Sequence, residues 1–136
     1  MRSLLKVDAR SLKQELIDRA TKVSDEALDK AYGYGLSTDT ESFGYKANKL
    51  SATYALHEFF HGESIDIDSV EYIANAVHDG WSYAAYHIED SRYLTQPYKK
   101  ANRLILADTS YTELPEEEKE KDRVIARSII NFLKQY

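Results

Sequence analysis

Apolar residues recur at three- and four-residue intervals through most of this chain, and few residues interrupt the pattern. The 136 residues include only two prolines and five glycines. Because proline and glycine are the residues that most strongly end regular structure, their scarcity favours long helices. The sequence therefore predicts a mostly α fold, a small helical domain of four to five helices.

Four amphipathic segments carry the strongest helical pattern. Within the first, Ser24 is followed by two acidic residues, so that helix either continues there or starts again. A less periodic stretch, 89–108, is expected to be a long irregular segment between the two last main helices. We therefore expect helices over residues 9–32, 45–61, 70–88 and 115–133.

Composition removes several classes of function. The length suits one domain, residues 1–136. The chain has no cysteine, which excludes cysteine nucleophiles and disulfide scaffolds and leaves histidine and carboxylate groups as metal ligands. A net charge of −5 argues against a general nucleic-acid coat. No signal peptide or membrane span is recognisable, so we expect a cytoplasmic protein with no membrane partner, in the host cytoplasm if a phage encodes it.

An HExxH pattern, His57-Glu58-Phe59-Phe60-His61, lies on the second expected helix. Histidines four residues apart share a helix face and can bind one zinc ion beside a catalytic glutamate. Such a site needs a third ligand, for which Glu71 and Glu89 are the candidates. The pattern leaves three interpretations open: a small zinc hydrolase, a non-catalytic ligand site, or two surface histidines.

Residues 92–103 contain four basic side chains and no acidic one, in an otherwise acidic protein. A positive, aromatic segment suits phosphates and a stacked base. The alternative is a solvated segment whose charges pair with the acidic helix start at Glu116–Glu120. Four charges are too few to bind duplex nucleic acid. The segment's basic residues are Arg92, Lys99, Lys100 and Arg103, and its tyrosines are Tyr93 and Tyr98.

Motifs for nucleophilic catalysis and for phosphate-binding loops are missing from the sequence. There is no GxSxG nucleophile motif, no phosphate-binding P-loop and no dinucleotide fingerprint. The sequence therefore favours binding over catalysis, with no cofactor.

Two motifs in the C-terminal half resemble the RyR domain, the repeat of ryanodine receptors that also occurs in bacterial and phage proteins. The first is Val77-His78-Asp79-Gly80-Trp81, and the second runs from Tyr111 through Leu114-Pro115-Glu116 to Asp122. The resemblance covers about half the chain, so residues 67–136 are expected to form the RyR-like region. Residues 1–66 resemble no family and are expected to form a helical N-terminal extension.

The resemblance implies a non-catalytic interaction module in which a tryptophan matching Trp81 holds an adenine nucleotide. It also implies sensing of nucleotide-derived signals in antiphage systems. The family's Trp-x-Tyr-Gly-Pro segment and Asp-Asp pair are not recognisable here. Trp81 is therefore the expected stacking surface, although at core spacing with Val77 and Ala84 it is also suited to the core. The expected ligand-binding residues are Trp81, His78, Tyr83, Tyr86, Arg92, Tyr93, Tyr98, Lys99, Lys100 and Arg103.

These patterns predict a protein that binds, and by binding sequesters, a nucleotide-derived small molecule such as a cyclic oligonucleotide or a cyclic ADP-ribose signal. A phage counter-defence protein would act in this way. We also expect a homo-oligomer, in which the tyrosine-rich N-terminal half packs against a second copy of the chain. The alternatives are a protein-interaction module, with the tyrosines docking a partner, and the zinc hydrolase.

Overall fold

The computed structural model describes residues 14–61 and 69–135. Within these ranges the chain forms five α-helices and two short 3₁₀ helices and contains no strand. The mostly α-helical prediction is therefore confirmed. The elements are α1 (Gln14–Tyr32), α2 (Phe43–His61), α3 (Ser69–His87), η3 (Ser91–Leu94), α4 (Pro97–Asp108), η4 (Tyr111–Glu113) and α5 (Glu116–Gln135).

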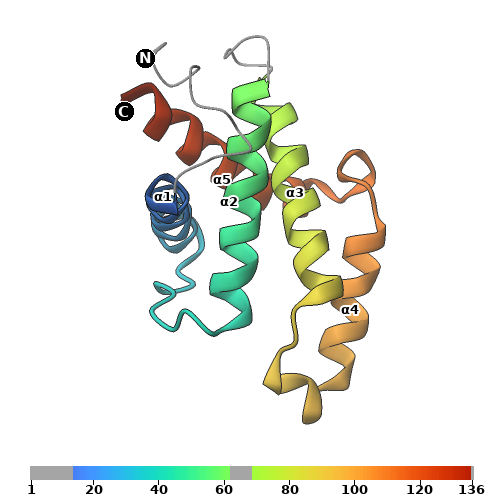
Figure 1. The fold of residues 1–136 in the computed structure, drawn as a ribbon. Helices are drawn as coiled ribbons and strands as arrows, with labels where there is room; N and C mark the ends of the chain where they lie inside the picture. The colour runs from blue at the N-terminus through green and yellow to red at the C-terminus, as the bar shows by residue number, and fades with distance from the viewer. Residues whose placement is uncertain (1–13, 62–68, 136) are drawn as a thin grey trace.

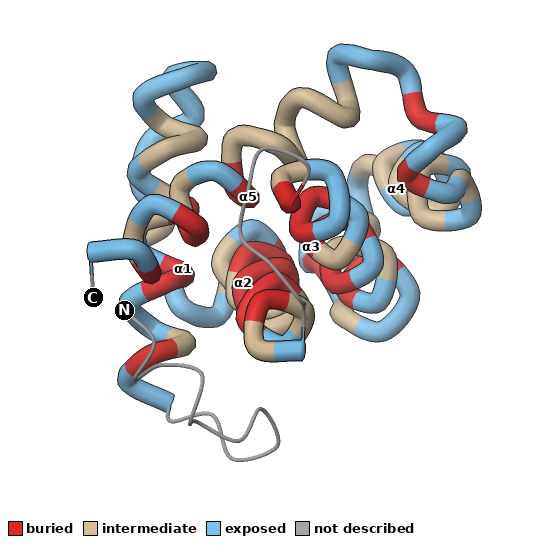
Figure 2. Tube along the Cα trace, turned by 90° about the horizontal axis from the view of Figure 1, so that it is seen from above, coloured by how far each residue is buried: buried red, intermediate tan, exposed pale blue. Residues whose placement is uncertain are grey.

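Helices α2 and α3 run antiparallel at the centre of the fold, as Figure 1 shows. α4 packs against α3 on the side away from α2, while α1 packs on α2 and α5. α5 also contacts α3 and passes behind the central pair. Figure 2 shows buried residues on α1, α2, α3 and α5 facing one another. The largest fully buried apolar side chains of this core are Phe59, Leu56, Ile129, Leu133 and Val77.

The two central helices come into backbone contact at Gly80. A Cβ atom placed on Gly80 would lie 2.6 Å from the Leu50 carbonyl oxygen and 2.8 Å from the Ser51 Cα. Beside this crossing the buried Ser51 hydroxyl donates a hydrogen bond of 3.0 Å to the Val77 carbonyl. Only glycine fits between these backbones, so the glycine sets the spacing of α2 and α3.

Capping explains where α2 begins. The Ser42 hydroxyl accepts a hydrogen bond of 3.1 Å from the Tyr45 backbone N–H, which otherwise has no partner at a helix start. The helix therefore starts at Phe43, two residues before the expected position. The last helix begins at Glu116, directly after Pro115, as the sequence predicts.

The prediction that residues 89–108 form an irregular segment is wrong for most of that stretch. Residues Ser91–Leu94 form η3 and Pro97–Asp108 form α4, a regular helix with proline in its first turn. No residue of α4 is fully buried, because this outer helix packs mainly on α3 and on the short η3. A helix that buries no complete side chain leaves a faint apolar period, which is why the pattern is hard to see in the sequence.

The alternative restart at Ser24 does not occur. α1 continues through it, and the buried Ser24 hydroxyl donates to the Ala20 carbonyl at 2.8 Å. Residues 9–13 of the expected first helix, and the boundary at residues 66 and 67, lie outside the described residues. None of the helices in the described ranges has the length and apolar character that crossing a membrane requires.

Replacing Gly80 with alanine tests the contact between α2 and α3. We expect Gly80→Ala to lower the free energy of unfolding by about 1–3 kcal/mol, because the added methyl group must push two backbones apart. Gly44→Ala is the matched control, because the nearest heavy atom to its added Cβ is 4.0 Å away. The control should change stability by at most about 1 kcal/mol. Equal stabilities of the two variants in chemical denaturation would contradict this role of Gly80.

Candidate functional site

A cavity of about 840 Å³ lies among all five α-helices. Residues of α2 and α3 line it from the centre of the fold, and η3 and α4 supply basic side chains. α1 and the segment 34–37 supply further polar and acidic lining, and α5 supplies both acidic residues and the basic Lys121. Half of the ten predicted ligand-binding residues line this cavity: His78, Trp81, Arg92, Lys99 and Arg103.

Trp81 is both a packing residue and a lining residue. Its indole packs against the small cluster of Phe43, Ala47 and Ala84, and it also borders the cavity. The His78 ring stacks beside it, with centroids 6.2 Å apart and planes 15° from parallel. Trp81 is therefore partly buried: one part of its side chain packs in the core and another part borders the cavity.

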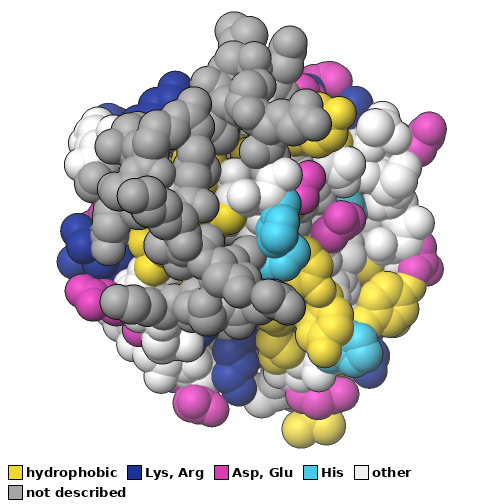
Figure 3. All heavy atoms as spheres, turned by 45° about the horizontal axis from the view of Figure 1, so that its top comes forward, with side chains coloured by type: hydrophobic (Ala, Val, Ile, Leu, Met, Phe, Trp, Pro, Cys, Tyr) yellow, Lys and Arg dark blue, Asp and Glu magenta, His cyan; other side chains and the backbone are white. Residues whose placement is uncertain are grey.

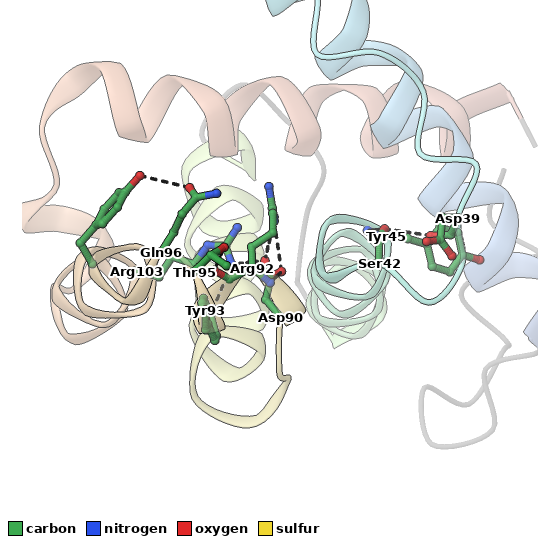
Figure 4. A network of polar contacts seen from close by, with 10 residues as sticks. Asp39, Ser42, Tyr45, Asp90, Arg92, Tyr93, Thr95, Gln96 and Arg103 are labelled. Atoms are coloured by element: carbon green, nitrogen blue, oxygen red, sulfur yellow. Dashed lines mark hydrogen bonds and ion pairs between the residues drawn. The ribbon is translucent and has the colours of Figure 1, made fainter.

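Two of the basic residues are fixed by one carboxylate, as Figure 4 shows. Asp90 is buried and accepts hydrogen bonds from Arg92 Nη2 at 2.7 Å and from Arg103 Nη1 at 2.8 Å. Arg103 also donates to the Tyr93 hydroxyl and lies 3.9 Å above the Phe43 ring. These bonds, first of all that from Arg92, hold the pKa of Asp90 well below its usual range. The cluster carries one net positive charge in a rigid arrangement.

The two lysines of the basic segment have different surroundings. Lys99 lines the cavity, and its amino group makes no ion pair with any described residue. Lys100 does not line the cavity and lies 3.8 Å from Glu89. The basic residues of the segment 92–103 do not pair with the acidic start of α5. Glu116, Glu118 and Glu120 pair instead with basic residues of α5 itself.

The predicted tyrosines lie outside the cavity lining. Tyr83 and Tyr86 are exposed on α3, and the Tyr83 ring lies 4.2 Å from that of His87. Successive helix residues are rotated by about 100°, so Tyr83 faces almost away from Trp81. Tyr98 is exposed and donates to Gln96, while Tyr93 serves the Asp90 cluster. These tyrosines were expected at the site because they lie close to Trp81 and the basic residues in the sequence, and that closeness does not bring their side chains into the cavity lining.

Two polar residues of the cavity, one buried and one largely buried, were not among the expected ligand-binding residues. Asn48 lies on α2 and is 8% exposed, and the Asp122 side chain on α5 is 13% exposed. Each interrupts the buried face of its helix, Asn48 one turn before Ala52 and Asp122 one turn before Ala126. A polar residue in the register of a buried stripe is the signal that could have identified them.

Asp122 and His78 meet at the edge of the cavity. The His78 Nε2 atom lies 2.7 Å from the Thr109 carbonyl oxygen, so this nitrogen carries the proton and donates it. The other ring nitrogen, Nδ1, lies 3.8 Å from an Asp122 carboxyl oxygen. Burial, followed by the negative charge of Glu118, raises the pKa of Asp122 to about 8. The Asp122 carboxyl is therefore largely protonated at neutral pH.

The HExxH pattern does not gain a third ligand in the described part of the chain. His57 and His61 are exposed, with ring centroids 4.5 Å apart. Glu71 instead accepts hydrogen bonds from Arg123 and Tyr111, and Glu89 lies beside Lys100. The described residues contain no cluster of three or more side chains able to hold a metal ion.

The pKa of Asp122 predicts a pH-dependent stability. Between about pH 4 and pH 8 the folded protein keeps a proton on Asp122 that the unfolded chain releases, so stability falls as the pH rises. Asp122→Asn removes this linkage but leaves the facing side chains of His78, Glu118, Lys121 and Asp79 in place.

The measurement is denaturant unfolding at pH 5 and at pH 8. The free energy of unfolding of Asp122→Asn, relative to the unchanged protein, should be higher at pH 8 than at pH 5. A relative stability that is constant or falls with pH would show that Asp122 is ionised in the folded state.

The two motifs that resemble the RyR domain both contribute to the cavity: His78 and Trp81 from the first, and Leu114, Glu118, Lys121 and Asp122 from the second. In comparisons with known proteins, no protein-family model, no curated protein and no solved structure matches this chain. The RyR resemblance therefore stays a prediction that the two motifs carry.

Proposed function

We propose that the protein binds a nucleotide-derived small molecule in the cavity and retains it unchanged. The observation that carries the proposal is the shared lining: the only tryptophan of the chain borders the same cavity as Arg92, Lys99 and Arg103. A volume of about 840 Å³ lies within the range of small-molecule sites, about 300–1,000 Å³.

The lining suits both parts of a nucleotide. An indole offers a flat face on which a base stacks, which contributes about 1–3 kcal/mol per base. Guanidinium and ammonium groups form charge-assisted hydrogen bonds to phosphate oxygens. Because Asp90 already fixes Arg92 and Arg103, these groups need little further ordering when a phosphate arrives. Lys99, which has no ion pair among the described residues, is the cation most available to a phosphate.

The biological role we propose is sequestration of a signal such as a cyclic oligonucleotide or a cyclic ADP-ribose derivative. Sequestration requires tight binding without turnover. The ligand should be recovered intact after long incubation with the protein, as chromatography would show. Release of a degraded product would contradict a purely binding role.

Neighbouring lysines provide a matched test of the site. A thermal-shift and calorimetry panel of cyclic di- and trinucleotides, cyclic ADP-ribose isomers, ADP-ribose and ATP should include at least one that binds. Lys99→Ala should weaken that binding about tenfold, because a charge-assisted hydrogen bond to phosphate contributes about 1.5–3 kcal/mol. Lys100→Ala, outside the cavity and beside Glu89, should leave the affinity unchanged.

Trp81→Ala is the second variant of this test, with Tyr83→Ala as its control on the opposite side of α3. Loss of the nucleotide shift in Trp81→Ala alone supports stacking on Trp81. Failure of every nucleotide to bind, or equal affinities of the two lysine variants, would contradict the proposal.

One observation favours a second function, a protein-interaction module. Several large side chains are exposed outside the cavity, and Figure 3 shows histidines on either side of a hydrophobic patch. Aromatic surface of this kind is enriched at protein interfaces. The most exposed of these residues are Leu94, Tyr72, Ile105, Tyr98, Tyr34, Leu36 and Tyr86. Absence of any nucleotide shift at concentrations far above micromolar would favour this function.

A further inference from the structure

Two polar side chains of the cavity lining have no hydrogen-bond partner among the described residues. Asn48 comes from α2 and Asp122 from α5, so they approach the cavity from different helices. The only ion-pair contact of either side chain in the described part of the chain is the 3.8 Å approach of Asp122 to His78. Within the described ranges no fully buried side-chain nitrogen or oxygen lacks a partner, so the polar ends of Asn48 and Asp122 reach the open space of the cavity.

Asn48 is 8% exposed and lines the cavity from α2 together with Ala47 and Ser51. The hydroxyl of Ser51 donates to the Val77 carbonyl and forms no hydrogen bond with the amide. The Asn48 amide therefore keeps its donors and its acceptor available to a molecule in the cavity.

The Asp122 carboxyl likewise has no hydrogen-bond partner among the described residues. One of its oxygens lies 3.8 Å from His78 Nδ1, which is too far for a hydrogen bond. His78 cannot turn toward it freely, because its Nε2 atom is held by the Thr109 carbonyl. The carboxyl group therefore has its hydrogen-bonding capacity available to a molecule in the cavity.

The charges of the lining give such a molecule a direction. Arg92, Lys99 and Arg103 come from η3 and α4. The α5 side of the cavity carries little net charge at neutral pH, because Lys121 pairs with Glu118 at 3.4 Å and the Asp122 carboxyl is largely protonated. Anionic phosphates are therefore attracted toward η3 and α4. A bound nucleotide therefore places its phosphates toward α4 and its base toward α5.

We propose that Asn48 and Asp122 hydrogen-bond the base of the bound nucleotide and thereby select base-containing ligands over sugar phosphates. The inference rests on the proposed function. An amide and a carboxyl group together offer donors and acceptors, and the edge of a nucleobase presents both in one plane. Trp81 borders the same space and supplies the face on which that plane stacks.

The test uses leucine, which fills a similar volume and forms no hydrogen bond. Asn48→Leu and Asp122→Leu should each lower the affinity for the best of ADP-ribose, ATP and cyclic di-AMP at least tenfold by calorimetry. Affinity for ribose 5-phosphate, which has no base, should be unchanged. Asn131→Leu, at an exposed position of α5, is the control and should alter neither affinity.

A second readout separates a binding role from a structural one. Removing an unsatisfied polar group should maintain or raise the melting temperature of the ligand-free protein. A melting temperature that falls in both leucine variants would show that these groups stabilise the fold, and it would overturn the inference. The inference would also be overturned if both leucine variants bound the nucleotide with the same affinity as the unchanged protein. If the unchanged protein binds no nucleotide, the proposed function fails and this inference fails with it.

Discussion

The close crossing of α2 and α3 at Gly80 is the contact on which the rest of the structure depends. It places two backbones within van der Waals contact and so leaves no freedom in the relative position of the central helices. Trp81 follows Gly80 directly, and Asn48 precedes the Leu50 carbonyl at the crossing by two residues. The innermost lining of the cavity is thus positioned by the same contact that builds the core.

The outer wall of the cavity depends on a different interaction, the buried carboxylate of Asp90. It joins η3 to α4 by binding one arginine from each. Removing one partner from a buried ion pair typically costs about 3–5 kcal/mol, although the partly exposed Arg92 reduces that figure here. Stability and site geometry are therefore coupled, since the same bonds that attach α4 also fix the cations that face the cavity.

Much of the fold could be predicted from the sequence, because helical spacing and capping residues are local signals. Pro115 marked the start of α5, and α1 ends at residue 32, where the sequence analysis places the end of the first helix. α4 was missed because it buries no complete side chain. Of the cavity lining, Trp81 was expected from the RyR resemblance and the arginines from the acid-free basic segment. Asn48 and Asp122 were not expected. Their polar positions in buried helix stripes are visible in the sequence, but their lack of a hydrogen-bond partner appears only in the packed structure.

Trp81 is the only tryptophan, so its fluorescence reports on the cavity directly. The most direct test of the account is a titration of the protein with ADP-ribose and with cyclic di- and trinucleotides while that fluorescence is recorded. Binding in the cavity predicts a saturable change with at least one of them and a smaller change with ribose 5-phosphate, which has no base to stack on Trp81. An emission that stays constant throughout, while calorimetry detects binding, would place the nucleotide elsewhere and contradict the central claim.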